Sequence, residues 1–274
     1  MLYGGKEILT DQRRNEIIKI IYREGKAYIS ELARRFDVSG ETIRRDLNEI
    51  SKNESIKKVY GGAICVKKPM REDSYEVRRL KNLEQKLAIA KYAARLVQNN
   101  DIIAVDTGTV TECFVNEING VQGIKVITNS LKIAQILTDK RKRGDFDGNI
   151  IMLGGDIDPE TGCAYSPLTN EMLSHFVADK AFIGTTAVNT AGAMAWETSH
   201  GIFTEELCRT AEKCILLADS YKFEKHSFYR SCSINEIDTI ITDDKNVISN
   251  SFKETCKENG CTLNIVNIEG EICK

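Results

Sequence analysis

The sequence lacks several features that mark common classes of protein. No segment approaches the roughly 18 consecutive apolar residues of a membrane-spanning helix, and no N-terminal stretch joins a basic end to an apolar run. The nine cysteines form no C-x-x-C pair, and the three histidines, His175, His200 and His226, lack zinc-ligand spacing. We therefore expect a cytoplasmic protein without a bound metal, whose thiols are reduced and mostly structural.

Motifs of the common nucleotide-binding and hydrolytic proteins are also missing. Neither Walker-A nor Gly-x-Gly-x-x-Gly spacing occurs, which disfavours a nucleotide ligand. There is no G-x-S-x-G elbow, and no histidine lies close in sequence to a plausible nucleophile. The sequence therefore predicts no catalytic residues and no cofactor.

Charge is distributed unevenly along the 274 residues. Residues 1–71 carry 16 Lys and Arg against 10 Asp and Glu, which leaves 22 and 30 of the chain totals of 38 and 40 for the remainder. A basic N-terminal part on an acidic body fits a polyanion-binding domain joined to a domain of another kind, although chance variation would produce the same asymmetry. The length also suits two domains.

Residues 29–50 have the pattern of a helix-turn-helix, whose second helix enters the DNA major groove. A short amphipathic helix is expected over residues 29–36 and a second over residues 41–50, after a turn that contains Gly40. Ile43, Leu47 and Ile50 share one face of the second helix, which predicts their burial. The residues expected to meet DNA or to cap this helix are Ser39, Thr42, Arg44, Arg45 and Asn48. An ordinary surface helix with a solvated arginine pair is the alternative.

The segments around this motif complete a small domain. A helix over residues 11–23 precedes it, and residues 56–66 predict two short strands around a Gly-Gly turn, which form a wing. The wing residues expected to meet the phosphate backbone are Lys57, Lys58, Tyr60 and Gly61. We expect the winged domain over residues 1–66, a linker over 67–80 and a second domain over 81–274. One long helix over residues 73–98 is expected to connect them.

The C-terminal part alternates short apolar runs with helical stretches. The runs expected as strands lie at residues 102–105, 125–127, 150–153, 180–184, 214–218, 239–241 and 263–266. Buried strands that alternate with helices predict a mostly parallel sheet covered on both faces. The expected fold class is therefore a winged helix-turn-helix followed by a Rossmann-like α/β domain.

Small polar residues follow several of these strands, at the sheet edge where ligands of α/β proteins bind. Glycines let a backbone approach closely, hydroxyls and helix N-termini favour anions, and carboxylates accept hydrogen bonds from sugar hydroxyls. The residues expected to bind a ligand at this edge are Asp106, Thr107, Gly108, Thr109, Thr111, Thr128, Asn129, Ser130, Gly154, Gly155, Lys180, Gly184, Asp219 and Lys222. This set suits a small phosphorylated polyol, although strand-to-helix turns also need glycines and caps for structure alone. Residues 193–200 around Trp196 are expected to form a loop, either a cover for the site or plain surface.

Several motifs resemble the DeoR family of bacterial transcriptional regulators. They lie at residues 29–47, 60–63, 82–86, 106–109, 128–130, 153–155, 179–184, 218–223 and 238–243, so that the resemblance covers about residues 11–245. It implies a winged helix-turn-helix followed by a sensor domain similar to ribose-5-phosphate isomerase and glucosamine-6-phosphate deaminase. Val110 replaces a frequent threonine of the family, and Tyr221 and Glu224 replace small residues, which bears on which sugar phosphate fits.

The resemblance implies a DNA-binding transcriptional regulator. Members of the family usually repress sugar-catabolism operons, and a phosphorylated sugar releases them from DNA. The expected partners are double-stranded operator DNA, a phosphorylated sugar and further copies of the chain in a dimer or tetramer, since helix-turn-helix proteins usually read two half-sites; no membrane partner is expected. A sugar-phosphate isomerase or deaminase with a DNA-binding head, and an activator of the same architecture, are the alternatives.

Overall fold

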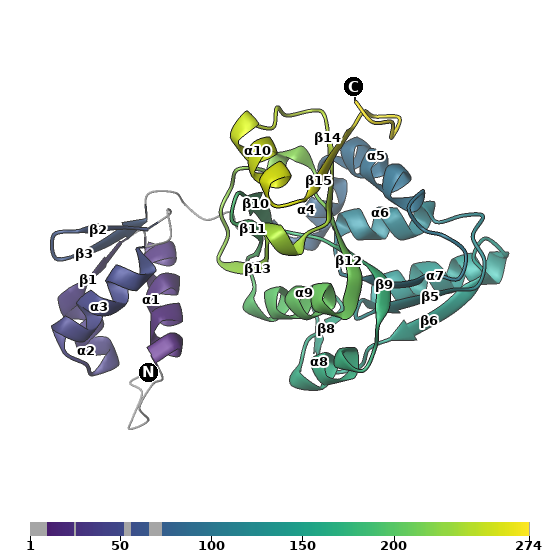
Figure 1. Cartoon of the computed structure of the whole chain (residues 1–274). Coiled ribbons are helices and arrows are strands. Elements are labelled where there is room, and N and C mark those ends of the chain that lie inside the picture. The colour runs from purple at the N-terminus through teal and green to yellow at the C-terminus, as the bar shows by residue number, and fades with distance from the viewer. Residues whose placement is uncertain (1–9, 25, 52–55, 66–72, 274) are drawn as a thin grey trace. The chain divides into compact units, whose positions relative to one another are not determined.

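The computed structural model describes residues 10–24, 26–51, 56–65 and 73–273, which belong to two compact units, Met1–Met70 and Arg71–Lys274 (Figure 1). The N-terminal unit is a winged helix-turn-helix. Its elements are α1 (Thr10–Glu24), β1 (Lys26–Tyr28), α2 (Ile29–Phe36), α3 (Gly40–Ile50), β2 (Ile56–Val59) and β3 (Gly62–Cys65). The strands form an antiparallel sheet in the order β1-β3-β2, so the expected two-stranded wing has a third strand.

Helix α3 is held in this unit by its apolar face. Ile43 and Leu47 are fully buried and Ile50 nearly so, as their spacing predicts. Helix α3 packs against both α1 and α2, which bring buried Ile17 and Leu32 to the same core. The remaining faces of α3 are thereby left to solvent.

The C-terminal unit is built on a seven-stranded parallel sheet in the order β15-β14-β12-β9-β4-β5-β6 (Figure 1). Its strands are β4 (Ile102–Val105), β5 (Ile124–Thr128), β6 (Gly148–Met152), β9 (Ala178–Ile183), β12 (Ala211–Leu217), β14 (Thr239–Asp243) and β15 (Thr262–Val266). Helices α5 (Leu83–Ala94), α6 (Thr109–Glu117) and α7 (Leu131–Arg143) cover one face, and α8 (Pro167–Ser174), α9 (Thr198–Thr210) and α10 (Asn250–Glu258) cover the other. The expected parallel α/β sheet with two covered faces is confirmed.

Two smaller sheets complete the unit. Strands β10 (Ala187–Asn189), β11 (Gly192–Ala195) and β13 (Tyr229–Ser233) form an antiparallel sheet, and β7 (Ile157–Asp158) pairs with β8 (Cys163–Ala164). The expected loop over residues 193–200 is wrong, because these residues end β11 and begin α9. Within the part of the chain that the structure describes, no helix is long and apolar enough to cross a membrane.

The expected single helix over residues 73–98 is also wrong. It is divided into α4 (Tyr75–Leu80) and α5, and Asn82 between them has a left-handed backbone with a φ of 54°. The Asn82 side-chain amide donates a hydrogen bond to Asp219 Oδ1 at 3.2 Å, which ties the bend to the sheet edge. Apolar periodicity persists on both sides of such a bend, so the sequence does not reveal it. The expected linker over residues 67–80 starts outside the described residues, and its second half contains α4.

The expectation of reduced thiols does not hold for Cys208 and Cys214, which form a disulfide. Helix α9 ends at Thr210 and β12 begins at Ala211, so the chain reverses at once and places the two Cα atoms 5.3 Å apart. This separation lies within the range that a disulfide can bridge.

Candidate DNA-binding and effector sites

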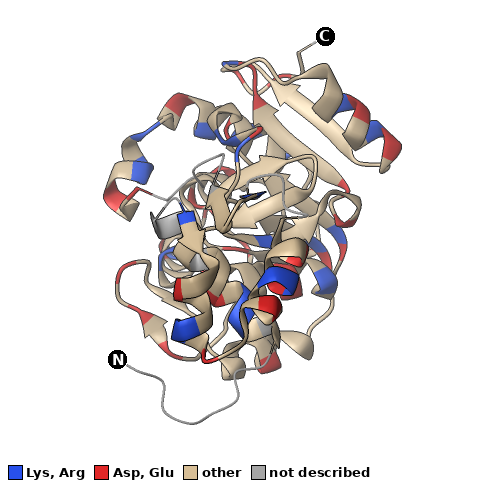
Figure 2. Cartoon of the chain, turned by 90° about the vertical axis from the view of Figure 1, so that its left-hand side faces the viewer, with Lys and Arg blue, Asp and Glu red and all other residues tan. Residues whose placement is uncertain are grey.

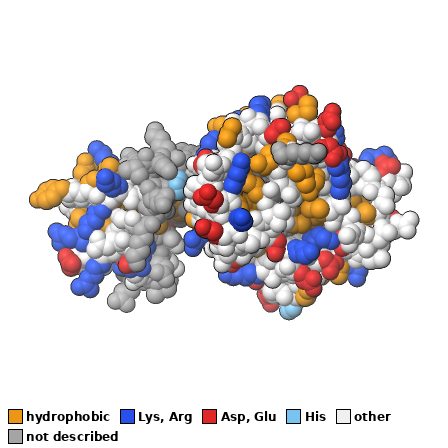
Figure 3. Space-filling view, turned by 45° about the horizontal axis from the view of Figure 1, so that its top comes forward, with side chains coloured by type: hydrophobic (Ala, Val, Ile, Leu, Met, Phe, Trp, Pro, Cys, Tyr) orange, Lys and Arg blue, Asp and Glu red, His pale blue; other side chains and the backbone are white. Residues whose placement is uncertain are grey.

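Arg44 and Arg45 lie outside the buried face of α3. Their side chains are 54% and 79% exposed, and each approaches Glu41, at 3.2 and 4.0 Å respectively. Exposed pairs of this kind are weak, so both guanidinium groups are available for a phosphate or a base edge. Figure 2 colours the Lys and Arg positions of the chain blue, and Figure 3 shows Lys and Arg side chains on the surface of the N-terminal unit.

Polar contacts fix the start of α3 and join the helix to the wing. Ser39 Oγ accepts a hydrogen bond from the Thr42 N–H at 3.1 Å and so caps the helix. Lys58 Nζ donates a hydrogen bond to Asn48 Oδ1 at 2.6 Å, so a residue expected at the phosphate backbone touches one expected near the bases. The other wing residues expected to meet DNA are all exposed: Lys57, Tyr60 and Gly61.

A buried carboxylate, which was not predicted from the sequence, holds α3 against α1 through two arginines. Asp46 is 2% exposed, and its two carboxylate oxygens accept hydrogen bonds from Arg13 Nε at 2.7 Å and Arg14 Nε at 3.0 Å. Asp46 lies three positions after Ile43 on the apolar face of α3, so helical periodicity places it on the buried side, whereas its charge predicts exposure. The pair is a structural contact, because a carboxylate on this face is turned away from solvent and hence from DNA.

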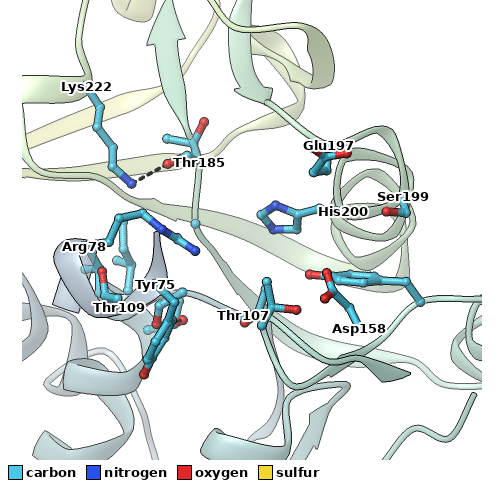
Figure 4. A pocket seen from close by; sticks show the side chains of 17 residues that line it. Tyr75, Arg78, Thr107, Thr109, Asp158, Thr185, Glu197, Ser199, His200 and Lys222 are labelled. Atoms are coloured by element: carbon cyan, nitrogen blue, oxygen red, sulfur yellow. Dashed lines mark hydrogen bonds between the residues drawn. The ribbon is translucent and has the colours of Figure 1, made fainter. Parts of the chain in front are cut away.

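The C-terminal unit has a pocket at the carboxyl ends of β4, β9 and β12 (Figure 4). This is the edge at which parallel α/β sheets bind ligands. The residues that line the pocket are Tyr75, Arg78, Thr107, Gly108, Thr109, Val110, Thr111, Asp158, Thr161, Tyr165, Gly184, Thr185, Glu197, Ser199, His200, Leu217 and Lys222.

Some of the residues expected to bind an effector line this pocket, namely Thr107, Gly108, Thr109, Thr111, Gly184 and Lys222. Gly108 has a φ of 151°, which favours glycine, and it precedes α6, whose first turn has no side-chain cap. Lys222 Nζ donates a hydrogen bond to the Thr185 carbonyl in the pocket wall (Figure 4).

Asp106 lies beneath the pocket and does not line it. The carboxylate is fully buried and accepts hydrogen bonds from the Thr107 N–H at 2.8 Å and the Thr204 hydroxyl at 2.9 Å. Its Oδ2 also lies 3.2 Å from His200 Nε2. Asp106 therefore positions pocket residues, including the His200 ring, from behind.

The other expected effector residues do not line this pocket: Thr128, Asn129, Ser130, Gly154, Gly155, Lys180 and Asp219. Ser130 caps α7, and the Asn129 side-chain amide donates to the Ala164 carbonyl. Lys180 pairs with Asp101 at 2.5 Å, at the amino end of the sheet. Asp219 is 3% exposed and accepts the hydrogen bond from Asn82.

Several charged, polar and aromatic residues that complete the pocket were not predicted from the sequence. Tyr75 and Arg78 come from α4, within the stretch expected as a linker. Glu197, Ser199 and His200 come from the start of α9, within the stretch expected as a loop. No motif marked these positions. The expected loop over residues 193–200 was the only signal for Glu197, Ser199 and His200, and nothing indicated Tyr75 or Arg78.

The pocket has two chemically different sides. Figure 4 shows Arg78, Lys222 and Thr109 on one side, and Asp158, Glu197, Ser199 and His200 on the other. Behind the cationic side, Lys86 is 3% exposed and its Nζ donates to the Arg78 carbonyl. Burial and then the nearby charge of Lys222 lower the pKa of Lys86 to about 8. An anion on this side would therefore meet a concentration of positive charge.

The aromatic wall of the pocket is fixed by a buried carboxyl group. The Tyr75 hydroxyl donates a hydrogen bond to Glu112 Oε2 at 2.5 Å, and Lys132 Nζ lies over the Tyr75 ring. Burial raises the pKa of Glu112, although the bond from Tyr75 opposes this rise. Helix α4 is thus attached to α6 at the pocket wall.

Comparison with protein families adds independent information. The family model of the DeoR-like helix-turn-helix domain matches residues 13–69, and that of the DeoR C-terminal sensor domain matches residues 81–244. The chain belongs to the DeoR family. This DeoR-family protein is therefore a DNA-binding transcriptional regulator, in which one unit binds DNA and the other is a sensor.

Several characterised relatives match most of the DeoR-family chain. The HTH-type transcriptional repressor GlcR of Bacillus subtilis is 29% identical, covering 92% of this chain and 95% of the relative. The glycerol-3-phosphate regulon repressor of Escherichia coli is 27% identical (85% and 90%), and the HTH-type transcriptional regulator GolR of Listeria innocua is 30% identical (85% and 91%). Among solved structures, ribose 5-phosphate isomerase A of Methanocaldococcus jannaschii matches 52% of this chain and 55% of its own, with 16% identity and a TM-score of 0.38.

Proposed function

We propose that this DeoR-family protein is a transcriptional repressor that leaves its operator when a small phosphorylated carbohydrate binds the sensor pocket. The observation that carries the proposal is the two-sided pocket, with cations on one side and acceptors on the other. The relatives named as repressors, one of them of a glycerol-3-phosphate regulon, agree with it.

The cationic side suits a phosphate group. Arg78 and Lys222 supply charge-assisted hydrogen bonds, and the first turn of α6 behind Gly108 presents backbone N–H groups at the positive end of a helix dipole. A guanidinium group and an uncapped helix start recognise a phosphate more strongly than a neutral hydroxyl.

The opposite side suits the hydroxyl groups of a sugar or polyol. Asp158 and Glu197 carry carboxylates that accept hydrogen bonds, and His200 is held in place by Asp106. A ligand that is anionic at one end and rich in hydroxyls at the other therefore matches both sides at once.

The N-terminal unit supplies the operator contacts. Helix α3 enters the major groove with Thr42, Arg44, Arg45 and Asn48, while Lys57, Lys58, Tyr60 and Gly61 of the wing approach the backbone. Operators with two half-sites require two such units, so the repressor acts as at least a dimer.

Thermal shift and DNA release test the proposal together. The full chain would be heated with phosphorylated three- to six-carbon sugars and polyols, each beside its unphosphorylated counterpart. A ligand that binds only the folded state raises the Tm, so a phosphorylated compound should raise it and its counterpart should not. The same compound should release the protein from DNA fragments selected out of a random pool. Equal shifts with both forms, or a shift without release, would contradict the proposal.

The proposal also holds that the sensor does not turn its ligand over. After prolonged incubation, the compound that shifts the Tm should be recovered unchanged by chromatography. Conversion into an isomer or a deaminated product would instead favour a sugar-phosphate isomerase or deaminase with a DNA-binding head.

A further inference from the structure

Three cysteines meet in the C-terminal unit, outside the effector pocket. Cys208 lies in α9, Cys214 in β12 and Cys232 in β13, and their sulfur atoms lie within 4.8 Å of one another. Cys208 and Cys214 form the disulfide, and Cys232 Sγ lies 3.2 Å from Cys208 Sγ. Cys208 therefore has two possible partners within bonding reach.

The surroundings of the three sulfurs favour uncharged forms. They belong to the apolar cluster on the α9 face of the sheet, which includes Phe203 and Leu207. Burial raises the pKa of the Cys232 thiol, so its thiolate is a minor form and an exchange that proceeds through it is slow. Three thiolates around a divalent ion would bury a net negative charge here, whereas thiols and disulfides bury none. Three sulfur atoms at this spacing also suit a soft metal ion, so the experiment must distinguish a disulfide-forming site from a metal site.

We propose that Cys208, Cys214 and Cys232 form a redox site in which Cys208 bonds to either of the other two. Hydrogen peroxide supplies the oxidant: two thiols lose two electrons and two protons to it, one S–S bond forms, and the O–O bond breaks to give two water molecules. In the exchange step, the Cys232 thiolate attacks Cys208 Sγ. The Cys208–Cys214 bond breaks, and Cys214 leaves as a thiolate that takes up the proton that Cys232 released.

The two disulfides would attach α9 to different parts of the unit. The bond to Cys214 joins the end of α9 to the following strand of the large sheet. The bond to Cys232 joins it to β13, in the small sheet beside α9. Since the first turn of α9 carries Ser199 and His200 in the pocket, the redox state changes how a wall of the effector site is anchored. The redox site itself does not depend on the proposed repressor function.

Disulfide mapping of the full-length protein tests the proposal. The protein would be reduced with dithiothreitol, freed of it, treated with hydrogen peroxide, unfolded in iodoacetamide and digested with trypsin without reduction. Arg209 and Lys213 lie between Cys208 and Cys214, so trypsin separates the two and their disulfide appears as a cross-linked peptide pair. We expect this pair as the main product, with a smaller amount of the Cys208–Cys232 pair.

A Cys214→Ser variant should shift the product entirely to the Cys208–Cys232 pair. Cys113→Ser, which removes a thiol of α6, is the matched control and should leave the wild-type pattern. Full alkylation of all three thiols after peroxide would overturn the site. Absence of the Cys208–Cys232 pair from both wild type and variant would overturn the exchange. One zinc ion retained per reduced chain, with all three thiols protected, would show a metal site instead.

Discussion

At the scale of single residues, two neighbouring positions of α3 are expected to serve different purposes, one stability and the other DNA binding. Asp46 is buried against Arg13 and Arg14, while Arg45 beside it is among the most exposed side chains of the helix. Removal of one partner from a buried pair leaves a charge uncompensated and costs roughly 3–5 kcal/mol. Asp46→Ala should therefore lower the free energy of unfolding of the N-terminal unit by about this amount, measured by urea titration. An unchanged midpoint would show that the pair does not stabilise α3.

Arg45→Ala should affect DNA binding and not stability, because the Arg45 side chain makes no buried contact. We expect operator affinity to fall by roughly 1–3 kcal/mol while the unfolding midpoint stays within error. Fluorescence anisotropy with operator and unrelated DNA measures the affinity. Lys91→Ala, which removes an exposed charge from α5, is the control. If both variants bind like the wild type, Arg45 has no part in recognition.

Lys86 should make the stability of the C-terminal unit depend on pH. Its pKa of about 8 in the folded unit lies below 10.5, the ordinary pKa of a lysine, which applies in the unfolded chain. Between these values the unfolded chain keeps a proton that the folded unit has released, so stability rises with pH, by at most about 1.4 kcal/mol per pH unit. Below pH 8 both states hold the proton and the contribution is flat.

Denaturant titrations of wild type and Lys86→Met at pH 7, 8, 9 and 10 isolate this contribution. The difference in unfolding free energy should be constant up to about pH 8 and then move in favour of the wild type. Two curves that stay parallel to pH 10 would show that Lys86 has an ordinary pKa in the folded unit.

At the scale of elements, strands and the recognition helix were predictable because their signal is local. A strand such as β4 is a short apolar run between polar residues, and Ser39 marks the start of α3. The bend at Asn82 was not predictable, since it depends on a hydrogen bond to Asp219, which is 137 positions away.

The candidate site shows the same division. The turn at Gly108 was predictable because it directly follows β4. Arg78, Glu197 and His200 were not, because they reach the pocket from helices whose positions follow from tertiary packing. Lys180 was wrongly expected in the site for a similar reason. Its ion pair with Asp101, 79 positions away, holds it at the amino end of the sheet, opposite the pocket.

The wing gives a prediction at this scale, because its two lysines have different contacts. Lys57 is exposed, whereas Lys58 donates to Asn48 on α3. Lys57→Ala should weaken binding to all DNA sequences alike and reduce the slope of log K against log salt by about 0.9, the value for one phosphate contact. Lys58→Ala should in addition change the ranking of operator variants, because it frees the Asn48 amide. If both variants rank the operator sequences in the same order, Lys58 contacts only the phosphate backbone of the DNA.

At the scale of the whole molecule, the proposed function requires that the effector favour the state that binds DNA poorly. By linkage, DNA must then weaken effector binding by the same factor. Arg78 is well placed to test this, since it lines the pocket from α4, the first helix of the C-terminal unit.

Arg78→Ala should bind operator normally but need about 10- to 100-fold more effector for release, because a charge-assisted hydrogen bond contributes roughly 1.5–3 kcal/mol. Arg79→Ala is the matched control, since Arg79 is exposed and does not line the pocket. Gel-shift titrations with the compound found by thermal shift would measure both. Equal release of Arg78→Ala and wild type would remove Arg78 from the phosphate site.

The pocket is lined by residues that are added to the growing chain at widely different times during translation. Arg78 and Lys222 are 144 positions apart, and at roughly 5–20 residues per second about 7–30 s separate their synthesis. Throughout that interval the DNA-binding unit has all of its residues, while the pocket of the C-terminal unit still lacks Lys222. Every newly made chain is therefore equipped to bind DNA before it is able to respond to its effector.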